Sequence, residues 1–232
     1  MSFLRKISTR SCSSLREARS CQDYLSVCQN STISLSSLAF RGTFYEFQAK
    51  EAMETHLHLT DLVRVGGAGD NGVDLFGKWD FARLCNLKQL PQGQHPVNAL
   101  VQCKNYASKI KPNVVRELAG AYEYHTNRTR STTVPTFMFL VSPLGLTKLA
   151  QTQMDISFVP IVHVRISPMT REISGEGNED FLVQNWGSYT FGPVYMNEMA
   201  KTVAKDVIKH HNESGNGLNP LYKKIGRQII VN

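Results

Sequence analysis

The sequence predicts an α/β fold in which a central mixed sheet is flanked by helices. Apolar residues make up 41% and charged residues 19% of the 232 residues, which is typical of a globular chain with a buried core. Strand-like and helix-like segments alternate in the second half of the chain, and this alternation favours helices on both faces of a sheet. No apolar run approaches the roughly 18 residues of a membrane-spanning helix, so we expect no membrane span.

The elements are expected in the order α-β-β-β-α-β-α-β. A first helix is predicted from about Thr43 to Leu59, because Phe44, Phe47 and Ala52 can line one of its sides. Short runs of β-branched and other apolar residues then predict three strands, at 61–65, 73–76 and 99–104. A long polar connection, from Asp80 to Asn98, separates the second strand from the third.

The second half of the chain continues the alternation. Pro112 suits the first turn of a helix, which is predicted from about Asn113 to Tyr124. The remaining expected elements are a strand at 135–141, a helix at 147–154, a strand at 158–166 and an amphipathic helix at 197–211.

The first 36 residues differ in composition from the rest of the chain. They hold five basic residues against two acidic ones, are rich in Ser, and contain no acidic residue before Glu17. These features are typical of a mitochondrial transit peptide, although a disordered basic arm would share them. We therefore expect a transit peptide and disordered leader at 1–36, a folded domain at 37–211, a C-terminal tail at 212–232, and location in the mitochondrial matrix.

Charge and cysteine content narrow the function classes. The net charge of +7 fits a polyanionic partner such as nucleic acid, although mitochondrial and membrane-surface proteins are also often basic. Only Cys85 and Cys103 of the five cysteines lie outside the leader, and they have no CxxC spacing. The sequence therefore predicts neither a disulfide framework nor a zinc site.

The segment GGAGDNGVDLFG, residues 66–77, contains a GxGxxG motif. In dinucleotide-binding proteins this motif follows a strand and opens a helix. Here the residues from Val73 to Gly77 alternate as in a strand, and Asn71-Gly72 between two strands is a strong hairpin signal. The glycines thus predict a tight turn that leads to Asp74, and no nucleotide cofactor is expected.

Polar residues of the third strand can meet Asp74. Alternate side chains of a strand point to opposite faces, so Gln102 and Lys104 share a face and can converge on Asp74 if the strands are neighbours. A carboxylate can hold a divalent metal, and a lysine can position water or neutralise charge on phosphorus. This layout suits phosphodiester hydrolysis, but the same residue types also occur on solvated surfaces, so the pattern alone leaves both interpretations open.

Several motifs in order resemble one nuclease family. GxGDNGVDL followed by VQCK resembles the Mrr-type branch of the PD-(D/E)XK restriction-endonuclease-like superfamily, in which Gln replaces the acid of the (D/E)xK pair. The flanking segments VVRELAGAY and FMFLVSPLGLTKLA, and GTFYE at Gly42–Glu46, also resemble this family, and the likeness covers Arg41 to about Ile166. With its basic leader, the chain further resembles a fungal mitochondrial family called required for respiratory growth, member seven.

The resemblance implies a restriction-endonuclease-like α-β-β-β-α-β core and an Mg²⁺ (or Mn²⁺)-dependent endonuclease. It makes Asp74 the metal-binding acid, Gln102 the substitute second ligand through its amide oxygen, and Lys104 the catalytic lysine. Glu46 would be an auxiliary acid on the first helix. Cys103 would bind the metal through its backbone carbonyl.

DNA is the partner that the resemblance implies, and a homodimer is compatible with it. Lys109, Lys111 and Arg116 would contact phosphates, although a solubilising surface would hold the same residues. Gln in place of Glu removes one negative charge and would weaken metal binding. The alternative is therefore a catalytically inactive nuclease-fold module that binds mitochondrial nucleic acid or an assembly partner. The resemblance links both roles to respiratory growth and mitochondrial genome maintenance.

Overall fold

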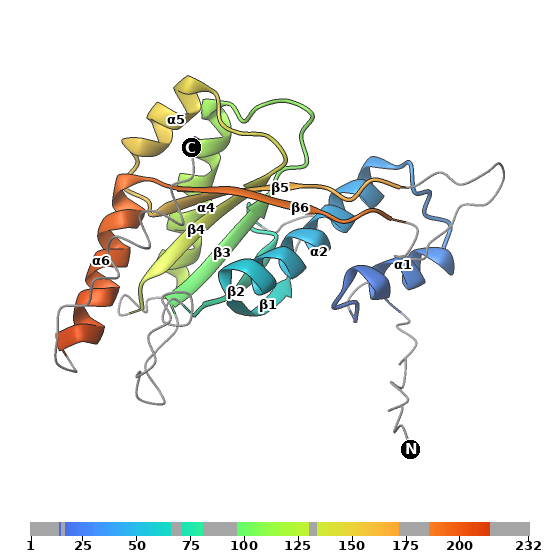
Figure 1. Cartoon of the computed structure of the whole chain (residues 1–232), viewed down its shortest axis with the longest axis horizontal. Coiled ribbons are helices and arrows are strands. Elements are labelled where there is room, and N and C mark those ends of the chain that lie inside the picture. Colours follow the sequence, from blue (N-terminus) through green and yellow to red (C-terminus); the bar gives the residue numbers. More distant parts are fainter. Residues whose placement is uncertain are drawn as a thin grey trace, which may run out of the picture.

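A six-stranded mixed sheet forms the centre of the computed structural model of this protein (Figure 1). The structure describes residues 14, 17–65, 71–80, 97–129, 134–171 and 186–213. The strands are β1 (Leu59–Arg64), β2 (Leu75–Trp79), β3 (Val97–Cys103), β4 (Thr136–Ser142), β5 (Ile161–Ser167) and β6 (Thr190–Met196). They lie side by side in chain order. The strands β3, β4 and β5 are parallel, so their carboxyl ends share one edge of the sheet, and the other neighbouring pairs are antiparallel.

Helices cover both faces of this sheet, as the α/β prediction requires. The described residues form five helices: α1 (Cys21–Gln29), α2 (Leu38–Leu57), α4 (Pro112–Thr129), α5 (Lys148–Asp155) and α6 (Glu198–Glu213). Apolar side chains of α2 and α6, such as Ala52 and Ala200, form one core with one face of the sheet. Those of α4 and α5, such as Leu118 and Met154, form a second core with the other face. Hydrophobic burial on both faces is the main stabilising contribution to such a layered fold.

The strand β3 shows how the sequence assigns side chains to these two layers. Val97, Ala99 and Val101 belong to the core beneath α2, whereas Leu100 belongs to the core beneath α4. Because side chains alternate along a strand, residues at even positions of β3 face α4. Gln102, which follows Leu100 by two residues, is therefore directed toward α4.

The helix α1 corrects the prediction of a disordered leader at 1–36. Ser20 and Asp23 form a reciprocal capping box at its N-terminus. Its buried residues, Cys21, Tyr24, Leu25 and Cys28, lie at the spacing of one helical face and pack against α2. The ring of Tyr24 stacks on that of Phe40, with centroids 5.4 Å apart. Because the first 36 residues are rich in Ser, their composition did not indicate this apolar helical face. The first 13 residues lie outside the described part, so the targeting function stays a prediction.

The strand β6 was not predicted. It contains Gly192 and Pro193, which break the strand pattern in the sequence. Proline is tolerated in β6 because this strand lies at an edge of the sheet and has a strand partner on one side only. Most of the predicted polar connection and the predicted tail lie outside the described residues. Within the described residues, no helix is both long enough and apolar enough to cross a membrane.

Candidate functional site

A tight turn carries the chain into β2. Asn71 and Gly72 both have positive φ angles, 52° and 80°, which is the backbone conformation that a type I′ hairpin turn requires. Two residues later, the backbone of Asp74 is held from both sides. Its carbonyl accepts a hydrogen bond from the Val65 amide, and its amide donates to the Val101 carbonyl, both at 2.8 Å. The turn thus fixes Asp74 between the ends of β1 and β3.

The Asp74 side chain is buried, with 5% of its surface exposed. Its Oδ2 accepts hydrogen bonds from Gln102 Nε2 at 2.5 Å and from the Cys103 amide at 2.6 Å. A buried carboxylate needs such donors, because removing its charge from water is otherwise costly. Gln102 Nε2 also lies 3.5 Å from the Cys103 carbonyl oxygen. A carboxylate, a side-chain amide and a backbone carbonyl therefore meet at the carboxyl end of β3.

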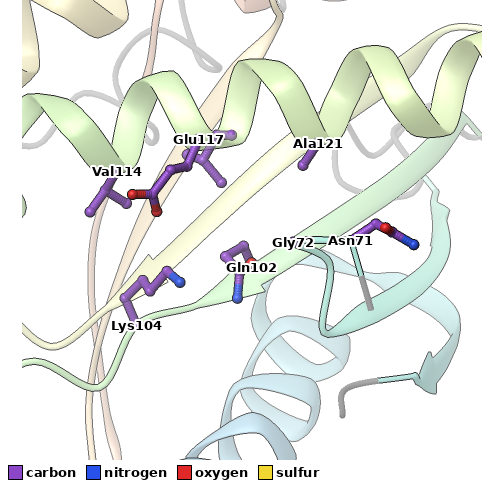
Figure 2. Close-up of a pocket in the computed structure, with 8 residues that line it drawn as sticks. Asn71, Gly72, Gln102, Lys104, Val114, Glu117 and Ala121 are labelled. Carbon is purple, nitrogen blue, oxygen red and sulfur yellow. The ribbon is translucent and has the colours of Figure 1, made fainter. Parts of the chain in front are cut away.

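A cavity of about 300 Å³ opens beside this cluster, between α4 and the sheet (Figure 2). Gln102 and Lys104 line its sheet side, as the shared face predicted from the sequence requires, and Asn71 and Gly72 line one end. The residues on the helix side are Val114, Glu117, Leu118 and Ala121. In Figure 2 the Lys104 amine points toward Gln102, and the Glu117 carboxylate points from α4 into the space above Lys104.

The predicted auxiliary acid, Glu46, lies in a different setting. Its carboxylate forms an ion pair with the guanidinium of Arg64 at the end of β1, and both side chains are less than one-fifth exposed. Arg64 also lies 3.4 Å from Thr43 Oγ1 and stacks over the Phe47 ring. Glu46 does not line the cavity. Its charge is already matched by a neighbouring cation.

The thiol of Cys103 is not suited to nucleophilic chemistry. Burial raises its pKa well above the usual value, and the nearby negative charges of Asp74 and Glu46 raise it further. The positive charges of Lys104 and Arg64 oppose this effect but are smaller causes. A thiol that stays protonated is a poor nucleophile and metal ligand. The thiol of Cys103 is therefore a poor candidate for the site, and a metal-binding role of its backbone carbonyl stays a prediction.

The chemistry of the donors limits which metal this site could hold. Among the described residues, no group of three or more His, Cys, Asp or Glu side chains is arranged as a metal centre. The remaining donors are oxygen atoms of Asp74, Gln102 and the Cys103 backbone. The amide of Gln102 can rotate to exchange its nitrogen and oxygen, and this rotation would place two oxygen atoms together. Such a donor set suits a hard cation such as Mg²⁺ and does not suit zinc.

Three basic residues predicted to contact phosphates are all exposed. Lys109 and Lys111 flank Ile110, whose amide donates to the Gly145 carbonyl at 3.1 Å and anchors the loop before α4. Arg116 lies on α4 beside the cavity-lining Glu117. All three are free to meet a ligand in solvent.

Sequence reasoning missed Glu117 and Arg64. A signal for Glu117 is present, because it lies among Val114, Leu118 and Ala121 at the spacing of one helical face. Of these four residues, Glu117 alone is exposed. Arg64 ends a strand next to the glycine turn, and nothing in its spacing indicates an ion pair with Glu46.

Comparison with known proteins gives one family. The family model described as "Required for respiratory growth protein 7" matches residues 37–204. Similar proteins, all named "Required for respiratory growth protein 7, mitochondrial", occur in several yeasts. The one from Candida glabrata is 29% identical, and the alignment covers 79% of this chain and 86% of the relative. The one from Vanderwaltozyma polyspora is 26% identical over 67% and 75%. The one from Eremothecium gossypii is 31% identical over 62% and 70%. No solved structure matches significantly.

Proposed function

This chain belongs to the required for respiratory growth protein 7 family, and we propose that it is a metal-dependent nuclease that hydrolyses phosphodiester bonds. The names of its relatives support the predicted mitochondrial location and a role in respiratory growth. We further propose that this role is the maintenance of mitochondrial DNA. The names of the relatives do not mention a nuclease, so the site itself has to support the reaction.

The observation that carries the proposal is the contact of Asp74 with Gln102 beside a cavity that also holds Lys104. These residues come from two neighbouring strands and meet where β3 ends. A buried carboxylate, a neutral amide and a lysine around an open space supply a cation ligand, a second oxygen donor and a positive charge. Metal-dependent phosphodiester hydrolysis can use these three groups.

The donor oxygens fit a hard divalent cation. Asp74 would bind it through its carboxylate, Gln102 through its amide oxygen after rotation, and Cys103 through its carbonyl. Mg²⁺ is commonly held by one or two carboxylates together with substrate phosphates, so a site poor in acidic residues is compatible with it. When bound, the cation would lower the pKa of the attacking water and offset negative charge on the phosphate.

Lys104 would act on the substrate directly. Its ammonium group lines the cavity next to Gln102, where it can donate hydrogen bonds to a non-bridging phosphate oxygen and to the attacking water. The water oxygen forms a bond to phosphorus and loses a proton to solvent, one phosphorus–oxygen ester bond breaks, and the leaving oxygen receives a proton from solvent. Negative charge grows on the phosphate oxygens in this step, and a fixed cation stabilises that charge.

DNA is the proposed substrate. The exposed Lys109 and Lys111 lie just before α4 and the exposed Arg116 lies on it, within a few residues of the cavity-lining Val114 and Glu117. Phosphate contacts of this kind give affinity without base specificity. Replacement of the three residues by alanine should weaken DNA binding and flatten its salt dependence, whereas Lys205→Ala on α6 should change neither.

Cleavage of supercoiled plasmid with Mg²⁺ or Mn²⁺ tests the proposal. The full chain is compared with Asp74→Ala and Lys104→Ala, and Lys205→Ala serves as the matched lysine control because Lys205 is exposed on a distant helix. We expect cleavage by the parent and by Lys205→Ala, and at least about 100-fold less by the two site variants.

Equal inactivity of the parent and both site variants on DNA and RNA substrates would refute the nuclease. If the parent still bound nucleic acid in that case, the result would favour the inactive nuclease-fold module. Gln102 in place of an acidic ligand is the feature that gives this second function its support.

A further inference from the structure

The cavity contains an acidic residue that the proposed metal site does not use. Glu117 projects from α4, and its carboxylate points into the space above Lys104 (Figure 2). The other helix residues that line the cavity, Val114, Leu118 and Ala121, are apolar and buried. Glu117 is itself exposed, so it contributes nothing to the core, and its carboxylate is accessible to a ligand in the cavity.

The contacts of Glu117 leave its charge available. Within the described part of the chain, its one side-chain hydrogen bond comes from Asn113 Nδ2 at 3.3 Å, near the long limit for such a bond. None of the ion pairs between described residues includes Glu117. Glu46 differs in this respect, because Arg64 already matches its charge.

The charges of the other residues around the proposed metal site show why a further negative charge from Glu117 would matter. Asp74 contributes one negative charge, Gln102 contributes none, and Lys104 contributes one positive charge. The Glu46–Arg64 pair adds no net charge. Without Glu117 the site is therefore neutral overall, and a neutral site has little affinity for a divalent cation, since affinity follows the number of charged ligands.

We propose that Glu117 provides the second negative charge for a divalent cation held by Asp74 and Gln102, and so replaces the acid that Gln102 lacks. This inference rests on the proposed function, because it assigns a residue to that same metal site. Glu117 and Gln102 line the cavity from the helix side and the sheet side, and Asp74, just before β2, would reach the cation beside Gln102, to which it is hydrogen-bonded.

Binding of Mn²⁺ to the full chain, followed by the electron paramagnetic resonance signal of free Mn²⁺, tests this role without reliance on cleavage. We expect Glu117→Gln to weaken binding about ten-fold or more. Glu123→Gln is the matched control, because Glu123 is exposed on the same helix but does not line the cavity. It should bind Mn²⁺ as the parent does. Thermal unfolding checks that both variants keep the fold.

A charge exchange makes the test sharper. If Glu117 replaces a missing acid at position 102, then Gln102→Glu in the Glu117→Gln background should restore Mn²⁺ binding to within a few-fold of the parent. Restoration together with an unaffected Glu123→Gln variant would support the role.

The outcomes separate this inference from the proposed function. If Asp74→Asn loses Mn²⁺ binding while Glu117→Gln keeps it, Glu117 has no such role, but the proposed nuclease stands. If the parent itself binds no Mn²⁺, the metal-dependent nuclease fails, and the role of Glu117 fails with it.

Discussion

Two pairs of buried polar side chains lie between neighbouring strands of the sheet. Asp74 and Gln102 meet between β2 and β3, with 5% and 7% of their surfaces exposed and 2.5 Å between bonded atoms. Ser142 and His163 meet between β4 and β5, with 1% and 3% exposed and 2.8 Å between bonded atoms. By burial and distance alone, either pair could be taken for a functional site.

Their surroundings differ. The Ser142 hydroxyl donates its proton to the Leu144 carbonyl at 2.8 Å, so it must accept from His163 Nε2, and both groups are satisfied inside the protein. In the other pair, Gln102 lines a cavity together with Lys104 and Glu117, and Asp74 is hydrogen-bonded to Gln102. A short hydrogen bond between buried groups therefore does not identify a site. Access to a cavity with further ionisable groups distinguishes the first pair, whereas His163 is a buried histidine whose Nε2 has a partner inside the protein.

The largest contrast should come from changing the accepting residue of each pair. Asp74→Asn should reduce plasmid cleavage at least about 100-fold, because it removes the charged ligand of the proposed cation, and it should change the unfolding free energy little. Ser142→Ala should keep cleavage but lower the unfolding free energy by about 1–3 kcal/mol, because it leaves the buried His163 donor unpaired. Cleavage assays and urea unfolding measure both effects.

The opposite results for the two variants would contradict this distinction between the two pairs. A Ser142→Ala variant that is as stable as the parent but inactive would move the active site to β4 and β5. An Asp74→Asn variant that remains fully active would leave the cavity without a catalytic role.

A smaller effect should appear in the pH dependence of stability. Burial lowers the pKa of His163 to about 4, from 6.5 in the unfolded chain, and the charge of Arg165 adds to the shift. The unfolded state therefore binds the proton more tightly. The resulting stabilisation is complete above pH 6.5 and is lost as the pH falls toward 4, by up to about 3 kcal/mol. Urea unfolding between pH 7 and pH 4 measures it.

His163→Gln is the matched variant, because its amide can still donate to Ser142 but does not titrate in this range. It should lose this part of the pH dependence. An unchanged slope between pH 6.5 and pH 4 would mean that other groups cause it.

Much of the fold and of the candidate site could be predicted from short stretches of the sequence. The Asn71-Gly72 turn and the alternation along β3 follow from steric rules within a few residues, and they place Asp74, Gln102 and Lys104 together. The ion pair of Glu46 with Arg64 joins residues 18 positions apart and depends on how α2 packs on β1. Glu117 reaches the cavity only because α4 lies over β3. These features depend on tertiary packing, which residue spacing does not encode.

The smallest predicted effect concerns the turn that carries Asp74. A Cβ atom at Gly72, where φ is +80°, would lie 3.0 Å from the Cβ of Ala121 on α4. Gly72→Ala should therefore strain the turn and lower the unfolding free energy by about 1–2 kcal/mol. Cleavage should fall as well, because Asp74 follows two residues later.

Gly120→Ala, one position before Ala121, is the control. A Cβ atom added at Gly120 would meet no atom within 4 Å, so this variant should instead stabilise the helix by about 0.5–1 kcal/mol. If both variants were equally stable and active, close contact between the turn and α4 would not be needed to position Asp74, and the cavity would tolerate a looser wall than the structure has.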